Sequence, residues 1–188
     1  MLKSKFNILP DFFTKRMILR RMIDDDASAL FNLRNNNIVN RYIDRAKEIT
    51  KEDAVAFIKR INAGINECQW LYWAICPKES NQLIGTACLW NYSNIKNSIE
   101  IGYELLPEFF GQGIMSEVIE CLLDYAFTVL EINEIEAFTH EENESSIALL
   151  SKFNFKYMPG RLDTENIYNR IYVLRFKDYK KILIIYEV

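Results

Sequence analysis

Residues 101–127, which read IGYELLPEFFGQGIMSEVIECLLDYAF, decide the fold of this chain. Residues 97–106 have the composition and the apolar pattern of a strand. Gly111 and Gly113 then interrupt this pattern. From Ile114 onward, apolar side chains recur at the i, i+4 spacing of a helix that packs on a sheet. The stretch therefore predicts a strand, a glycine turn and an amphipathic helix.

Similar patterns on both sides of this stretch predict the remaining elements. Asp24, Asp25 and Asp26 can cap a helix that ends near Asn35, and Thr50 opens a capping box for a second helix. A fourth helix is predicted over residues 144–153, and strands over residues 16–22, 70–76, 82–91, 97–106, 132–139, 155–158 and 167–176. The order βααβββαβαββ predicts an α+β fold with a mixed sheet.

The composition is that of an ordinary globular protein. The 188 residues are 49% hydrophobic and 26% charged, and they contain no repeat or linker, so we expect one domain over residues 1–188. A net charge of −3 argues against a nucleic-acid partner. No apolar run approaches roughly 18 residues, and the N-terminus has no apolar signal region, which argues against a membrane partner.

The cysteines argue against a metal site. The spacing of the four cysteines and the single His140 does not fit a zinc site, so we expect no metal. Reduced, mostly buried thiols would suit a cytoplasmic protein. The cysteines are Cys68, Cys76, Cys88 and Cys121.

Charge is distributed unevenly along the chain. Residues 101–150 contain 11 acidic side chains and no lysine or arginine, whereas residues 1–50 and residues 151–188 each carry a net charge of +4. This pattern is either a solvated acidic face or a field that attracts a cationic substrate such as an amine.

The glycine turn is a candidate phosphate site. Glycines let a ligand approach the backbone, and the first turn of a helix presents unpaired N–H groups at its positive end. The residues contain neither a P-loop nor the third glycine of a dinucleotide-binding fingerprint. On these residues alone, the turn is either a phosphate cradle or a tight strand-to-helix connection.

Residues 101–127 resemble the acyl-CoA-binding motif of the GNAT N-acetyltransferases, whose signature is [QR]-x-x-G-x-[GA]. Three further stretches resemble the RimJ/RimL-like branch, the ribosomal-protein N-terminal acetyltransferases: residues 14–31 (TKRMILRRMIDDDASALF), 73–90 (WAICPKESNQLIGTACLW) and 141–157 (EENESSIALLSKFNFKY). The resemblance implies a mostly antiparallel sheet, flanked by helices and splayed open at its central strands. It also implies transfer of an acetyl group from acetyl-CoA to a protein N-terminal α-amine or a small amine, by direct attack in a ternary complex.

The resemblance further implies which residues hold acetyl-CoA. Leu105 and Leu106 would face the pantetheine, which pairs with the exposed strand edge. Asn143 and Ser146 match an N-x-x-S element that contacts the pantetheine arm or the leaving sulfur, and they are also suited to the start of a helix. The diphosphate would bind backbone N–H groups of Gly111, Gln112, Gly113, Ile114 and Met115.

Three positions depart from the family pattern. Glu108 occupies the first motif position and cannot donate to phosphate, and Gln112 stands where many relatives have lysine. Lys152, or a basic residue outside the motif, would have to bind the 3′-phosphate of coenzyme A. Leu150 occupies the position at which many members have a tyrosine that protonates the thiolate. The thiolate then either leaves unassisted or takes its proton from another group, for which the candidates are Ser146, Tyr157 and water.

Glu100 and Glu104 are the candidate bases. They face the same side of their strand as Gly102, so that together they could hold an incoming ammonium and deprotonate it through water. The alternative is that both are solvent-facing carboxylates. At pH 7 about one α-amine in seven is neutral but only about one lysine amine in 2,500. An N-terminal substrate therefore depends less on deprotonation by a base. A backbone N–H near Leu106 would stabilise the oxyanion.

Other features are open to more than one interpretation. His140 follows a strand and is more typical of a surface residue than of a base. The aromatic residues Trp70, Tyr72, Trp73 and Trp90 line an acceptor pocket or belong to the core. The apolar tail 182–188 could pair with a second copy in a homodimer. An acyl-CoA-binding sensor without turnover is the alternative function.

Overall fold

The computed structural model describes residues 8–45 and 50–179. Its strands form one eight-stranded sheet in the order β1-β2-β3-β4-β5-β6-β8-β7. The strands are β1 (Phe12–Phe13), β2 (Met17–Arg20), β3 (Leu71–Pro77), β4 (Gly85–Ser93), β5 (Ser98–Leu105), β6 (Glu134–His140), β7 (Lys156–Tyr157) and β8 (Asn169–Arg175). The helices are α1 (Ala27–Asn35), α2 (Lys51–Asn66), α3 (Ile114–Thr128) and α4 (Glu144–Lys152), with 3-10 turns η1 (Asp24–Asp26), η2 (Val39–Tyr42), η3 (Pro107–Phe109) and η4 (Phe176–Asp178).

The predicted α+β order is confirmed, with one strand more than expected. The added strand, β1, is two residues long and pairs with β2. Two caps are also confirmed: the Thr50 side chain accepts from the backbone N–H of Asp53 at the start of α2, and the Asn143 side chain accepts from Ser146 at the start of α4. The tail 182–188, which we considered for a homodimer, lies outside the described residues.

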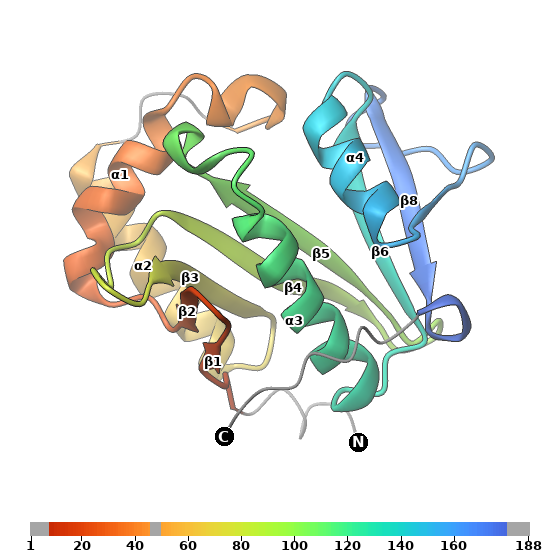
Figure 1. Cartoon of the computed structure of the whole chain (residues 1–188), viewed down its shortest axis with the longest axis horizontal. Helices are drawn as coiled ribbons and strands as arrows, with labels where there is room; N and C mark the ends of the chain where they lie inside the picture. The colour runs from red at the N-terminus through yellow and green to blue at the C-terminus, as the bar shows by residue number, and fades with distance from the viewer. Residues whose placement is uncertain (1–7, 46–49, 180–188) are drawn as a thin grey trace.

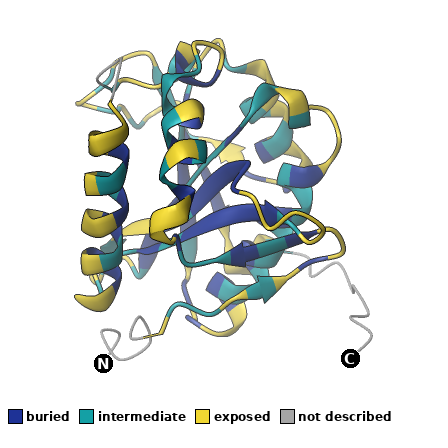
Figure 2. Ribbon diagram, turned by 90° about the vertical axis from the view of Figure 1, so that its left-hand side faces the viewer, coloured by how far each residue is buried: buried dark blue, intermediate teal, exposed yellow. Residues whose placement is uncertain are grey.

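The sheet separates two apolar cores. Alternate residues of β3 point to opposite faces, so Trp73 and Ile75 pack with α3 while Ala74 and Cys76 pack with α1 and α2. Figure 2 shows the buried faces of the helices turned inward and the exposed faces turned outward. No helix in residues 8–45 and 50–179 is long and apolar enough to cross a membrane.

The central strands splay apart as predicted. β5 and β6 pair in parallel only at Ser98–Glu100, opposite Glu134–Glu136. β5 then continues to Leu105 along β4, while β6 continues to His140 along β8. In Figure 1 the two strands run side by side at one end and diverge toward the other, where α4 and the segment around η2 face each other. Every other strand pair in the described sheet is antiparallel.

Candidate active site

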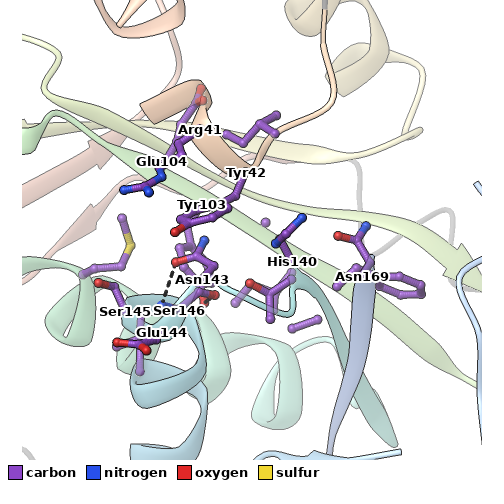
Figure 3. Close-up of a pocket in the computed structure, with 18 of the residues that line it drawn as sticks. Arg41, Tyr42, Tyr103, Glu104, His140, Asn143, Glu144, Ser145, Ser146 and Asn169 are labelled. Carbon is purple, nitrogen blue, oxygen red and sulfur yellow. Dashed lines mark hydrogen bonds between the residues drawn. The ribbon is translucent and has the colours of Figure 1, made fainter. Parts of the chain in front are cut away.

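A cleft of about 2040 Å³ opens where β5 and β6 separate. It is lined by β5, the glycine turn with the start of α3, the end of β6, α4 and the segment around η2. Figure 3 shows side chains from several of these elements converging. The described lining carries more acids than bases: Asp44, Glu100, Glu104, Glu141, Glu142, Glu144, Asp163 and Glu165 against Arg41, Lys152 and Arg161.

The glycine turn is open toward the cleft. Gly111 and Gly113 have φ angles of 70° and 74°, which L side chains adopt only with strain. A Cβ atom on Gly111 would meet no atom within 4 Å, so space for a ligand lies beside it. Gly113 is the N-cap of α3, and the N–H groups of the first turn after it have no partner within the helix. The turn therefore fits a diphosphate by backbone contacts alone.

Arg16 braces this turn from behind. Its Nη1 donates to the carbonyl oxygen of Gln112 at 3.0 Å, and its Nε donates to Glu117 Oε2 at 2.9 Å. Glu117 also accepts from the hydroxyl of Thr14 and from the backbone N–H of Arg16. These hydrogen bonds hold the pKa of Glu117 below its ordinary value, against the opposing effect of its partial burial. In a trans peptide the N–H points opposite to the C=O, so the N–H of Gly113 is turned away from Arg16.

The edge of β5 faces the gap with the backbone groups of Tyr103 and Leu105. The N–H of Leu106 donates to the carbonyl of Ile84 on the β4 side at 2.9 Å. Backbone groups of successive strand residues point to opposite sides, so those of Leu105 and Tyr103 face the side where β6 has departed. The Leu106 side chain packs toward α1 and α2 and does not line the cleft. The backbone N–H groups that could donate to an oxyanion are therefore those of Leu105 and Tyr103, and not that of Leu106.

Ser146 meets a tyrosine that the sequence interpretation did not consider. Its hydroxyl lies 2.8 Å from the hydroxyl of Tyr103 on β5, as the dashed line in Figure 3 shows. The backbone N–H of Ser146 donates to Asn143 Oδ1 at 3.2 Å, which fixes the first turn of α4. Burial raises the pKa of Tyr103 to about 12, so this phenol remains protonated.

The two candidate bases lie in different surroundings. Both oxygens of Glu104 are engaged, since Arg45 donates to Oε2 and the Thr86 hydroxyl donates to Oε1 at 3.0 Å. Arg45 Nε also donates to Asn40 Oδ1 at 2.7 Å, which ties this ion pair to η2.

Among residues 8–45 and 50–179, Glu100 forms no direct ion pair, although Arg161 is near enough to interact with it electrostatically. The Oε1 atom of Glu100 accepts from the side-chain amide of Asn91. Burial is the main cause that raises the pKa of Glu100, and the Asn91 hydrogen bond opposes it. Further carboxylates raise this pKa by repulsion: Glu136, Asp163 and Glu165.

The remaining predicted residues divide into those that line the cleft and those that do not. Lys152 and Asn143 line it, whereas Gln112 does not, because its side chain donates to the carbonyl of Glu108 at 2.7 Å. Tyr157 is exposed beside Tyr172 and does not line the cleft. Leu150 is buried in the core.

His140 and the aromatic residues are placed as follows. His140 lines the cleft between the rings of Tyr42 and Tyr168, with centroid distances of 5.2 and 5.7 Å. Trp73 is fully buried, and Trp90 is half exposed and lines the cleft. Trp70 and Tyr72 pack against the core beneath α2. Within residues 8–45 and 50–179, no group of three or more histidine, cysteine, aspartate or glutamate side chains could hold a metal.

Comparison with known proteins identifies the class to which this fold and cleft belong. Residues 16–156 match the model of the acetyltransferase (GNAT) domain. The chain is 34% identical over 149 residues to the N-acetyltransferase YoaA of Bacillus subtilis, a protein described as uncharacterized; the match covers 79% of this chain and 84% of YoaA. The chain belongs to the GNAT acetyltransferase family and is an N-acetyltransferase, as the resemblance implied.

Solved structures agree on the fold. A ribosomal-protein-S5-alanine acetyltransferase from Vibrio fischeri superposes with a TM-score of 0.73 at 19% identity, covering 91% of this chain and 99% of that one. RimJ of Mycobacterium smegmatis, solved in complex with CoA-disulfide, gives a TM-score of 0.73 at 17% identity, covering 89% of this chain and 88% of that one. At these identities the likeness concerns the fold.

Proposed function

We propose that the chain transfers the acetyl group of acetyl-CoA to a primary amine by direct attack in a ternary complex. One observation carries this proposal: β5 is unpaired with β6 beyond Glu100, and the backbone groups of Tyr103 and Leu105 face the cleft that opens there. Pantetheine in that gap would pair with Tyr103 and Leu105 as an extra strand does. Its diphosphate would then reach the N–H groups of Gly111, Gly113, Ile114 and Met115, all of which line the cleft.

The two faces of β5 separate the incoming amine from the departing sulfur. Glu100 and Glu104 alternate with Tyr103, so they point to the opposite face of the sheet. The Tyr103 side chain points toward α4 and contacts Ser146, whereas Glu104 points toward η2 through Arg45. We therefore propose that the amine approaches from the η2 side and that the thiolate leaves on the α4 side.

Glu100 is the base in this proposal, and Glu104 is a positioning residue. A general base must release the proton it takes, and a raised carboxyl pKa brings it closer to that of the amine. Each oxygen of Glu104 already accepts a hydrogen bond, from Arg45 and from Thr86, and these contacts fix the carboxylate against η2 and the neighbouring strand. Glu104 instead fixes η2, whose residues Val39, Arg41 and Tyr42 line the cleft.

The acceptor in this proposal is the N-terminal α-amine of a protein and not a lysine side chain, because a larger fraction of an α-amine is neutral near pH 7. Apolar side chains exposed on the rim, Ile38 and Leu162 among them, can contact the residues that follow a protein N-terminus. The surrounding carboxylates suit the positive charge of the α-ammonium. This assignment follows the RimJ/RimL-like resemblance. We propose as well that residues 1–188 form a single domain and that the protein acts in the cytoplasm.

A thiol-release assay tests the proposed function. Acetyl-CoA is offered with N-terminal peptides, polyamines, free amino acids and aminoglycosides, and free CoA is measured. The proposal expects CoA release with at least one amine, and fastest with N-terminal peptides. Binding of acetyl-CoA with no release against any amine would favour the acyl-CoA sensor instead.

A further inference from the structure

Tyr103 and Ser146 form a hydroxyl pair that comes from two separate elements. Tyr103 lies on β5 and Ser146 lies in the first turn of α4, and their oxygens are 2.8 Å apart within the cleft. Each hydroxyl carries one hydrogen. Their mutual hydrogen bond uses one of the two hydrogens, so the pair retains one for a third group.

The acidity of the two hydroxyls favours one direction for this bond. Either oxygen can be the donor in this contact. A phenol is a stronger acid than an alkyl hydroxyl and is thus the better donor, so donation from Tyr103 to Ser146 Oγ is the favoured direction. The Ser146 hydrogen is then free to point into the cleft. Leu150 stands where many family members have a tyrosine. Its side chain is buried in the core and has no hydroxyl, so it makes no hydrogen bond to the thiolate.

We propose, on the basis of the proposed function, that Tyr103 orients the Ser146 hydroxyl so that it donates a hydrogen bond to the thiolate of coenzyme A as the carbon–sulfur bond breaks. Ser146 is the catalytic residue of the pair, because it would touch the sulfur. Tyr103 is a positioning residue that acts through Ser146. No proton leaves either hydroxyl: the proton that neutralises the thiolate is the one that the amine loses when its nitrogen becomes an amide.

Burial supports this division of roles. Because the pKa of Tyr103 is raised to about 12, well above the roughly 8.5 of an ordinary thiol, full transfer of its proton to a thiolate is unfavourable. A donor that stays protonated throughout the reaction stabilises the developing charge without reorganisation, in the manner of an oxyanion hole. The sequence left open whether Ser146, Tyr157, water or no group assists the departing thiolate. In this proposal Ser146, oriented by Tyr103, assists it.

The pKa of the CoA thiol in its complex with the protein tests this inference directly. Thiolate formation is followed by its ultraviolet absorbance for free CoA and for CoA bound to the wild type, Tyr103→Phe and Ser146→Ala. We expect the bound thiol to be more acidic in the wild type than in either variant by about one unit, a tenfold change in ionisation. We also expect kcat to fall by about tenfold in both variants, while the KM for acetyl-CoA stays near that of the wild type.

Matched controls separate this effect from a general loss of hydroxyl groups. Ser151→Ala removes a hydroxyl from an exposed position of the same helix, and Tyr125→Phe removes one from α3; both are expected to titrate like the wild type. The other charged or titratable side chains that line the cleft, among them Glu104, Arg41, Tyr42, His140, Glu144 and Lys152, are the same in every variant. Thermal unfolding checks that each variant is folded, and Ser146→Thr, which keeps the hydroxyl, should restore the acidity of the thiol.

The outcomes distinguish this inference from the function on which it rests. If Tyr103→Phe binds CoA and leaves the thiol pKa and kcat at wild-type values, the role of Tyr103 is refuted while the acetyltransferase proposal stands. If the wild type does not bind CoA at all, the proposed function fails and this inference fails with it.

Discussion

Glu100 and Glu104 lie on one face of β5, yet their neighbours give them different tasks. Arg45 and Thr86 engage the carboxylate of Glu104, whereas Glu100 has one amide donor, a group of repelling carboxylates and the more distant cation Arg161. The sequence could place both side chains on one face, because strand alternation is local. The sequence could not distinguish their roles, because the residues that bind Glu104 are 59 and 18 positions away in the chain.

Glu100→Gln is expected to lower kcat/KM by at least about tenfold near neutral pH. As a base, Glu100 must be ionised, so the wild-type rate should fall as the pH drops through its raised pKa, and the variant should lose this acidic limb of the profile. Glu79→Gln, in an exposed turn, is the control. An unchanged pH–rate profile in Glu100→Gln would refute the role.

The raised pKa of Glu100 has a consequence for stability with a definite sign. The folded state holds the proton of Glu100 more tightly than the unfolded chain, so this contribution to stability is present at low pH and is lost as the pH rises through the folded-state pKa. Glu100→Gln should therefore unfold at a higher temperature than the wild type near pH 7, with the difference shrinking toward pH 4. Equal unfolding temperatures at every pH would contradict the assignment of a raised pKa.

At the scale of elements, most of the fold could be predicted because it depends on local patterns. The capping box at Thr50, the apolar stripe of α3 and the alternation along β5 each indicate their element without knowledge of the rest. Strand β1 escaped prediction because a two-residue pairing leaves no periodic signal. Arg16 escaped for another reason: its contact with Gln112 joins residues 96 positions apart, and the motif itself contains no cation.

A substitution at Arg16 tests whether its contact with the glycine turn positions that turn for CoA. Arg16→Gln removes the charged donor that holds the Gln112 carbonyl, and one such bond contributes about 1.5–3 kcal/mol. The Kd for CoA, measured by titration calorimetry, should rise by about tenfold or more, while kcat at saturating acetyl-CoA stays close to wild type. Arg21→Gln, on the same segment but bonded to Asn66 of α2, is the control. Equal CoA affinities in the two variants would show that the brace does not position the turn.

The ion pair of Arg45 and Glu104 joins the segment after η2 to the sheet. Both side chains are close to nine-tenths buried, so removing one partner leaves a buried charge and should cost about 3 kcal/mol of unfolding free energy. Arg45→Met and Glu104→Gln are each expected to destabilise the protein, and the double variant less than their sum, in denaturant unfolding. Strict additivity of the two effects would show that the pair is not coupled.

At the scale of the whole molecule, part of the acidic bias of residues 101–150 is brought to the cleft, which Glu104, Glu141, Glu142 and Glu144 line. β5, the segment that follows β6, and α4 bring these carboxylates to the same opening, where the described basic side chains of the lining are Arg41, Lys152 and Arg161. The sequence showed the bias but not the side on which it acts, since that depends on how distant strands are ordered in the sheet. The splay itself could be anticipated only through the family resemblance, because no local pattern specifies that β5 and β6 part after Glu100.

This field makes the salt dependence of the two substrates differ. Exposed charges are screened over about 10 Å at 0.1 M salt. The KM for a cationic N-terminal peptide should rise by about threefold or more between low and high salt, whereas the KM for the anionic acetyl-CoA should stay level or fall. A peptide KM that does not respond to salt would contradict an electrostatic role for the cleft.

A crystal structure of the protein with CoA bound tests the central claim most directly. The account predicts the diphosphate on the N–H groups at residues 111–115, the pantetheine along Tyr103 and Leu105, and the sulfur within hydrogen-bond reach of Ser146. A complex in which CoA lies outside the gap between β5 and β6, or in which the glycine turn makes no phosphate contact, would contradict it.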